Sequence, residues 1–124
     1  MSLIITREYL ISLLYLWKDN KINAKDLYDT ANILFNYNNI KFLDWEFDNQ
    51  HSVSLEVLTY LESLDLNLVI QQDIDYFIKF LNTKIGDFNN GYKIWDEYLK
   101  SINYETRKKV LKDIYPYSTV CQFN

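Results

Sequence analysis

The sequence predicts an all-α protein, a single compact bundle of five to six helices with one longer ordered loop. Breakers are scarce, with two Gly and one Pro among 124 residues, which favours long helices over a sheet with many tight turns. Apolar residues recur at helical spacing along most of the chain. The length fits one domain, residues 1–124, which at 48% hydrophobic content can bury a core without metal or disulfide.

The first two helices are predicted to form an antiparallel hairpin. Thr6 can cap a helix that runs to about Asp19, and its apolar residues cover more than half of its circumference, so we expect it to be central. Asn23 and Asp26 have the spacing of a capping box for a second helix, which ends in an Asn-rich cluster. Only residues 20–22 connect the two helices, and such short links join antiparallel neighbours.

Residues 40–51 are predicted to be the ordered loop. Acidic and apolar side chains alternate there, which also fits a short strand. A lone strand has nowhere to pair unless residues 66–70 provide a partner, so a small two-stranded ribbon is the alternative.

The third and fourth helices follow that loop. Ser52 or Ser54 opens the third helix, which places leucines 55, 58, 61 and 64 on one side. A connector at 65–70 leads to a fourth helix over about 71–82 with apolar residues at i, i+3, i+4 and i+7.

Two more helices complete the predicted bundle. Gly86 and the cluster at 89–91 indicate a loop before a fifth helix, in which Ile94, Trp95, Tyr98 and Leu99 share one side. Asn103 can cap a sixth helix from Tyr104 to about Ile114, and Pro116 ends the helical part before a tail over 117–124.

Charge is sorted along the chain. Residues 42–78 hold eight carboxylates and no Lys or Arg, a formal charge of -8, whereas the whole protein carries -4 and residues 99–124 sum to +3. Such a concentration can steer a positively charged partner onto the surface, and it argues against a nucleic-acid target. The alternative is that these carboxylates are the solvated faces of ordinary helices.

The acidic middle of the chain holds the predicted partner-binding residues. Trp45 lies between two acids, a pattern typical of an anchor for a basic partner, although it can equally plug the end of the bundle. The full predicted set is Asp44, Trp45, Glu46, Asp48, Asp65, Asp73 and Asp75.

The residues for catalysis and cofactor binding are largely missing, so we expect no enzyme, no cofactor and no metal. His51 is the only histidine and Cys121 the only cysteine, which rules out a zinc site, and Ser52 is better explained as a helix cap than as a nucleophile. No phosphate-binding glycine motif is present. A magnesium site built only from carboxylates is an alternative that needs several of them to converge.

The same features bear on location. The apolar run at 9–17 is too short to span a membrane, so we expect no membrane association. A single cysteine cannot form an intramolecular disulfide, and we therefore expect a cytoplasmic protein.

Four segments carry a resemblance to a known family. They are the Trp17-Lys18-x-x-Lys21-Ile22 turn, the connector LDLNLVIQQDI at 64–74, the stretch GYKIWDEYL at 91–99, and the aromatic tail around Tyr115-Pro116-Tyr117. In this order they resemble the small helical bacterial immunity proteins encoded beside toxins of contact-dependent growth inhibition and related polymorphic toxin systems.

The resemblance implies a cytosolic protein that binds a cognate toxin domain tightly and blocks it, often by covering the active site of an RNase or DNase. We expect a monomer that forms a 1:1 complex. Nucleases must bind a polyanion, so their clefts are usually basic, and an acidic inhibitor competes for the same charges. The alternatives are an acidic inhibitor or adaptor that mimics nucleic acid, a small enzyme that uses the carboxylates, and a self-associating bundle.

Overall fold

The computed structural model describes residues 2–47 and 50–121, and this part of the chain is mostly helical. Helices make up 59% of the structure in seven segments, so the all-α prediction is correct only in its coarse form. The helices are α1 (Arg7–Lys18), α2 (Ala24–Phe35), α3 (Val53–Glu62), α4 (Ile74–Leu81), α5 (Phe88–Lys100), α6 (Tyr104–Leu111) and α7 (Ser118–Cys121), with a 3-10 turn η1 (Gln71–Asp73) before α4. The strands are β1 (Leu3–Ile5), β2 (Ile40–Phe42), β3 (Trp45–Glu46) and β4 (His51–Ser52).

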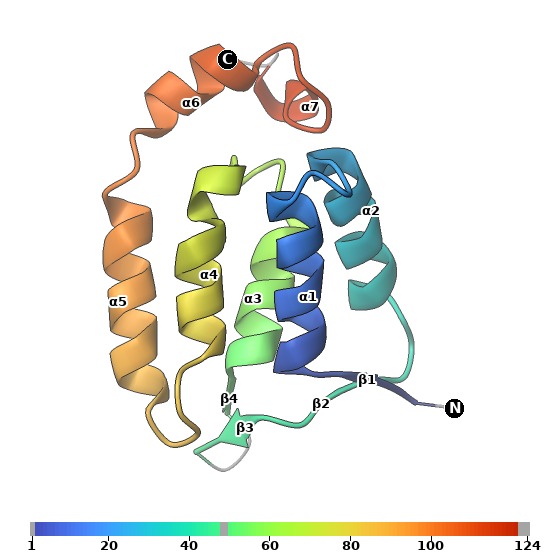
Figure 1. Ribbon diagram of the computed structural model, residues 1–124, viewed down its shortest axis with the longest axis vertical. Coiled ribbons are helices and arrows are strands. Elements are labelled where there is room, and N and C mark those ends of the chain that lie inside the picture. Colours follow the sequence, from blue (N-terminus) through green and yellow to red (C-terminus); the bar gives the residue numbers. More distant parts are fainter. Residues whose placement is uncertain (1, 48–49, 122–124) are drawn as a thin grey trace.

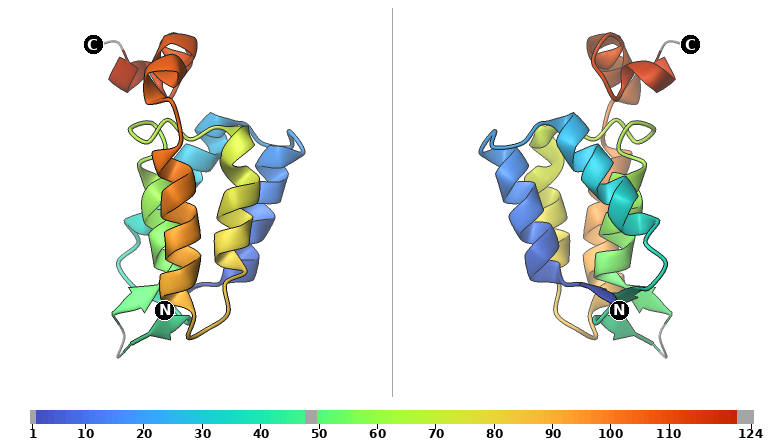
Figure 2. Two further views of the ribbon diagram at one scale, coloured as in Figure 1. Left: turned by 90° about the vertical axis from the view of Figure 1, so that its left-hand side faces the viewer. Right: turned by 90° about the vertical axis from the view of Figure 1, so that its right-hand side faces the viewer.

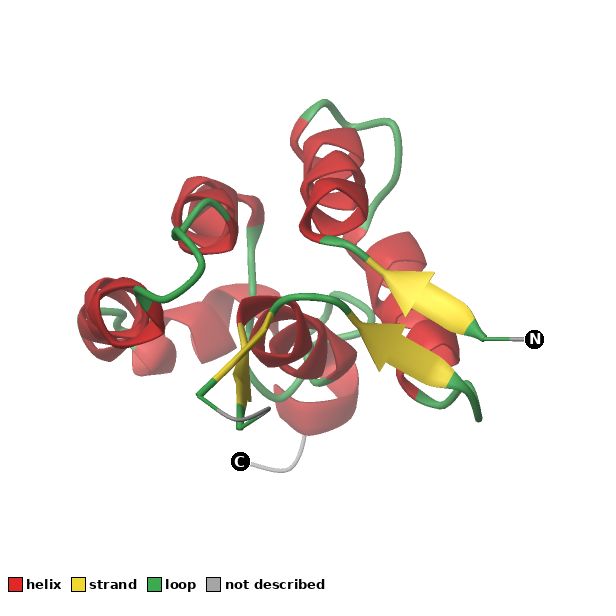
Figure 3. Cartoon of the chain, turned by 90° about the horizontal axis from the view of Figure 1, so that it is seen from below, coloured by secondary structure: helices red, strands yellow, loops and turns green. Residues whose placement is uncertain are grey.

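Helices α1 to α5 form a bundle in which consecutive helices alternate in direction (Figure 1). Helix α3 contacts α1, α2 and α4, and α5 packs against α4. Helices α6 and α7 lie beyond one end of this bundle, as the side views show (Figure 2). The short strands lie at the other end, which is seen end-on in Figure 3. The bundle therefore has two distinct ends, one closed by strands and one by short helices.

The core is centred on α3 rather than on α1. Val53, Val57, Leu58 and Leu61 of α3 are all fully buried. Helix α1 packs against α2, α3 and α4 and buries Leu10, Leu13, Leu14 and Trp17. Tyr9 and Leu16 are 38% and 41% exposed, so its buried face is narrower than predicted. The fourth helix behaves as predicted, with Ile74, Phe77 and Leu81 buried.

Four predicted helix caps are present. The side-chain oxygens of Thr6, Asn23, Ser52 and Asn103 accept from backbone N–H groups three residues later, at 3.1, 2.8, 3.1 and 3.1 Å. Asp26 completes the capping box by accepting from the Asn23 N–H at 3.0 Å. Each such cap stabilises its helix by about 1 kcal/mol.

The segment predicted to be a loop instead contains short strands. Residues 40–42 pair in parallel with β1, in the register Leu3 to Ile40, and β3 pairs antiparallel with β4. The alternative partner at 66–70 forms no strand; Leu68 there has a positive φ of 51°. The pairing of β2 with the N-terminal strand was missed because the two segments lie on either side of the α1–α2 hairpin.

The C-terminal helix boundaries also differ from the prediction. The cluster at 89–91 lies inside α5, where a Cβ on Gly91 would collide with the Thr83 side chain, so this glycine allows close approach and does not mark a loop. Helix α6 ends at Leu111, and residues 118–121 of the predicted tail form α7.

Candidate functional site

The structure separates the seven predicted partner-binding residues into several environments. Asp44, Glu46 and Asp73 are buried, with 8%, 6% and 1% of their surface exposed, so the prediction that they face a partner is wrong. Trp45 and Asp65 are half-buried and Asp75 is exposed, while Asp48 lies outside the described residues.

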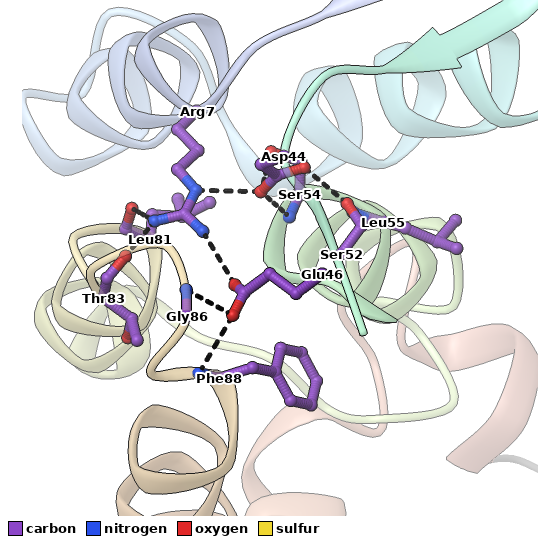
Figure 4. Close-up of polar contacts among 10 residues, drawn as sticks. All are labelled: Arg7, Asp44, Glu46, Ser52, Ser54, Leu55, Leu81, Thr83, Gly86 and Phe88. Atoms are coloured by element: carbon purple, nitrogen blue, oxygen red, sulfur yellow. Dashed lines mark hydrogen bonds and ion pairs between the residues drawn. The ribbon is translucent and has the colours of Figure 1, made fainter. Parts of the chain in front are cut away.

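Asp44 and Glu46 are held by Arg7 at the strand end of the bundle (Figure 4). The Arg7 Nε donates to Asp44 Oδ2 at 2.8 Å, and its Nη2 lies 3.7 Å from Glu46 Oε2. Its Nη1 donates to the carbonyl oxygens of Leu81, the last residue of α4, and of Thr83, two residues later. One guanidinium thus joins α1, β3 and α4, a use that suits its planar set of five donors.

Asp44 also fixes the start of α3. Ser52 Oγ donates to its Oδ1 at 2.5 Å, and both the N–H and the Oγ of Ser54 donate to Oδ2 at 3.0 Å. Burial by itself disfavours the ionised carboxyl. The hydrogen bonds from Ser52, Arg7 and Ser54 outweigh that effect and hold the pKa of Asp44 below its ordinary value.

Glu46 fixes the start of α5 in a similar way. Its Oε1 accepts from the backbone N–H of Gly86 at 2.6 Å and of Phe88 at 3.3 Å. The N-terminal turn of a helix leaves such N–H groups without partners, and Asp87 makes no side-chain cap there. Glu46 therefore acts as a cap from a distant part of the sequence, and the negative charge suits the helix N-terminus.

Asp73 belongs to a second network at the opposite end. Arg107 binds it with two hydrogen bonds of 2.8 Å, from Nη1 to Oδ2 and from Nη2 to Oδ1. The Tyr98 hydroxyl donates to Oδ1, and the Ile70 N–H donates to Oδ2 at 2.9 Å. Arg107 also donates to the Leu68 carbonyl at 3.1 Å, so this network joins α6, α5 and the α3–α4 connection.

The two networks explain what sequence reasoning missed. The chain has eleven Lys and only two Arg, and both arginines neutralise buried carboxylates. Strand β3, which contains Glu46 and directly follows Asp44, lies at one end of the bundle, and the start of α4, which directly follows Asp73, lies at the other (Figure 1). A single acidic site built from 40–51 and 65–75 is therefore wrong. The scarcity of arginine in a lysine-rich chain was the available signal for these buried pairs.

Among the predicted partner-binding residues, Asp65 is the one that lies near other carboxylates that solvent can reach. Its Oδ2 lies 3.4 Å from the hydroxyls of Tyr28 and Thr119, and its Oδ1 accepts from the Leu66 N–H at 2.8 Å. Burial first, then the charge of Asp65, raises the pKa of Tyr28; Tyr115 and Glu62 contribute to the same shift. These contacts bring α2, the α3–α4 connection and α7 together, with Tyr115 just before α7.

We define the Asp65 surface as Tyr28, Asp29, Glu62, Asp65, Leu66 and Tyr115. Leu66 and Tyr115 are 63% and 49% exposed. Asp29 pairs with Lys25 at 2.7 Å, so three carboxylates and one lysine leave a formal charge of -2. Acidic groups beside exposed aromatic and apolar side chains form a surface suited to a cationic protein.

The remaining predicted residues lie apart from that surface. The Asp75 carboxylate pairs with Lys18 Nζ at 2.7 Å across α4 and α1. Trp45 packs edge-on against Phe42, with ring centroids 6.3 Å apart, near the Arg7 network. His51 stacks on Phe88 at 4.6 Å, and Ser52 caps α3, as the sequence predicted.

The described ranges hold neither a metal-binding cluster nor a membrane-spanning helix. Residues 2–47 and 50–121 contain no group of three or more His, Cys, Asp or Glu side chains placed to hold a metal ion. In the same ranges, none of the helices combines the length and the apolarity needed to cross a bilayer.

Comparison with known proteins gives no further guide to the site. No family model matches the sequence, and neither a curated protein nor a solved structure shows significant similarity to it.

Proposed function

We propose that this protein is an immunity protein that binds and neutralises a cationic bacterial toxin domain, and that it does so through the Asp65 surface. The observation that carries the proposal is the 3.4 Å contact between the Tyr28 hydroxyl and Asp65, with Glu62 and Tyr115 close enough to raise the pKa of Tyr28 and the Lys25–Asp29 pair beside Tyr115. The toxin we propose is a nuclease, an RNase or a DNase, bound in a 1:1 complex in the cytoplasm, where its nucleic-acid substrate lies.

Two properties of this surface support tight and fast binding. Tyrosines are frequent hot-spot residues because they bury a large area with few rotatable bonds. Carboxylates at the rim of such a surface mainly raise the association rate, and this effect weakens with salt. The surface is built from three separate parts of a stable bundle, so it is largely ordered before a partner arrives.

The direct test uses the protein encoded beside this gene, which the proposal requires to be cationic. Co-expression should rescue the growth of cells that produce that protein's C-terminal domain, and the purified pair should form a 1:1 complex. Glu62→Lys with Asp65→Lys should then slow association by about tenfold at low salt and by less at 0.5 M salt.

A matched control isolates the surface from net charge. Glu8→Lys with Glu97→Lys reverses two exposed carboxylates, at the start of α1 and on α5, and makes the same change in net charge, yet it should have a much smaller effect. The proposal fails if the neighbouring protein does not bind, and the assigned surface fails if all the reversals act alike.

A further inference from the structure

A cavity of about 320 Å³ lies between α4 and α5, on the side of the molecule away from α2 and α7 (Figure 1). Its lining includes Tyr76, Lys79, Lys84, Gly91, Ile94 and Trp95. This volume is at the lower end of the range for small-molecule sites. Thr83 also lines the cavity and is the one lining residue that the Arg7 network uses, through its carbonyl oxygen.

The walls of the cavity are aromatic and aliphatic. Trp95 stacks on Phe80 with ring centroids 4.6 Å apart and an interplanar angle of 15°. Tyr76 stacks on Tyr98 at 3.6 Å, yet 41% of Tyr76 and 45% of Ile94 remain exposed. Gly91 adds no side chain to the space. Trp95 is itself only 4% exposed, so the accessible apolar surface on which an aromatic ring can pack comes mainly from Tyr76 and Ile94.

The polar groups around the cavity are mainly donors. Lys79 and Lys84 are exposed and make no ion pair within the described part of the chain. The one carboxylate of the lining, Asp87, accepts from the Asn90 amide at 2.6 Å. The Trp95 Nε1 is buried and has no acceptor among the described residues, a state that costs about 1–3 kcal/mol.

We propose that this cavity binds a small free acid in which a carboxylate is attached to an aromatic group. The ring packs between Tyr76, Ile94 and Trp95, and the carboxylate faces Lys79 and Lys84. Charge complementarity decides the sign of the ligand, because the lining holds one carboxylate and two lysines that make no ion pair with a described residue, a net charge of +1. The small volume favours a free acid over a segment of a protein.

The test is a titration of the ¹⁵N-labelled protein with sodium 3-phenylpropionate, followed by amide chemical shifts. We expect saturable shifts confined to residues 76–95. The neutral analogue 3-phenylpropanamide should bind about tenfold more weakly, because it lacks the charge that Lys79 and Lys84 attract.

Variants on α4 and α5 connect binding to the two lysines. Lys79→Gln with Lys84→Gln should weaken binding of the acid by about tenfold and leave the weak binding of the amide unchanged. Lys93→Gln removes one exposed charge from α5 outside the lining of the cavity and is the matched control for each single variant, Lys79→Gln or Lys84→Gln. Because all three lysines are exposed, the variants should keep the dispersed spectrum of the folded protein.

Three results would overturn the proposal. These are no saturable shift, shifts centred outside residues 76–95, and equal affinity for the acid and the amide.

A blocked dipeptide, acetyl-phenylalanyl-glutamate amide, forms a second arm. If it binds as tightly as 3-phenylpropionate, the free acid is overturned as the occupant. The Asp65 surface is not involved, so failure here leaves the proposed toxin complex untouched.

Discussion

Replacing Arg7 by Met should destabilise the protein more than the loss of any exposed ion pair. The Arg7 side chain is 13% exposed, and those of Asp44 and Glu46 are 9% and 2% exposed. Removing the shared cation leaves two buried carboxylates without a counter-charge, and breaking a buried pair in this way costs about 3–5 kcal/mol. Asp44 keeps its bonds from Ser52 and Ser54, so we expect the lower end, about 3 kcal/mol.

The measurement is urea unfolding at pH 7, followed by circular dichroism. For a chain of this size, a loss of about 3 kcal/mol lowers the urea midpoint by about 2 M. Arg7→Lys should lose less, because it keeps the charge while giving up some of the bonds to the carbonyls of Leu81 and Thr83. If Arg7→Met does not fold, Arg7→Lys still provides a measurable loss.

The control is Lys18→Met, which breaks the pair with Asp75. Those side chains are 45% and 72% exposed, so the midpoint should stay where it is in the parent protein. If Arg7→Met and Lys18→Met have the same midpoint, Arg7 does not neutralise the buried acids and the reasoning is refuted.

Three further changes test individual contacts. Because the pKa of Asp44 is lowered, the stability that its ionised carboxylate contributes is present above pH about 4 and is lost as the pH falls further. In Asp44→Asn, the urea midpoint should therefore fall less between pH 5 and pH 2 than it does in the parent protein. An equal fall in both proteins would contradict this. Burial and the hydrogen bond to Asp73 raise the pKa of Tyr98 to about 12, so the stability that its neutral hydroxyl contributes is lost as the pH rises above about 10. In Tyr98→Phe, the urea midpoint should therefore fall less between pH 9 and pH 12 than in the parent protein. A steeper fall in the variant would argue against the bond. Gly91→Ala should lower the free energy of unfolding by about 1–3 kcal/mol, because the new methyl group collides with the Thr83 side chain. Helix propensity alone predicts the opposite, so an increase in thermal stability would refute the close contact.

The local features of this fold could be predicted from sequence because their causes are local. Thr6, Asn23, Ser52 and Asn103 cap helices by reaching backbone groups only three residues away. The apolar spacing of α4 specifies its buried face in the same way. Such signals need no knowledge of the rest of the chain.

The strands and the buried charges depend on distant partners, and this is why they were missed. Residues 40–42 alternate weakly, and only the approach of Leu3–Ile5 makes them a strand. Asp44 is 37 residues from Arg7, and Asp73 is 34 residues from Arg107. An acid that will be buried beside a guanidinium looks, in sequence, like an acid that will face solvent.

Charge along the chain is consequently a poor measure of the charge that a partner meets. Of the eight carboxylates at 42–78, three are buried against the only two arginines, and both arginines lie outside that segment. Asp29 lies outside it too, yet it belongs to the Asp65 surface. Charge reversal at Asp44 or Glu46 would place a cation beside Arg7 in a buried site and would test folding rather than binding. Binding is tested at Glu62 and Asp65, which are half-buried and, among the described residues, not paired with an arginine, so a reversed charge there lies nearer to solvent than at Asp44 or Glu46.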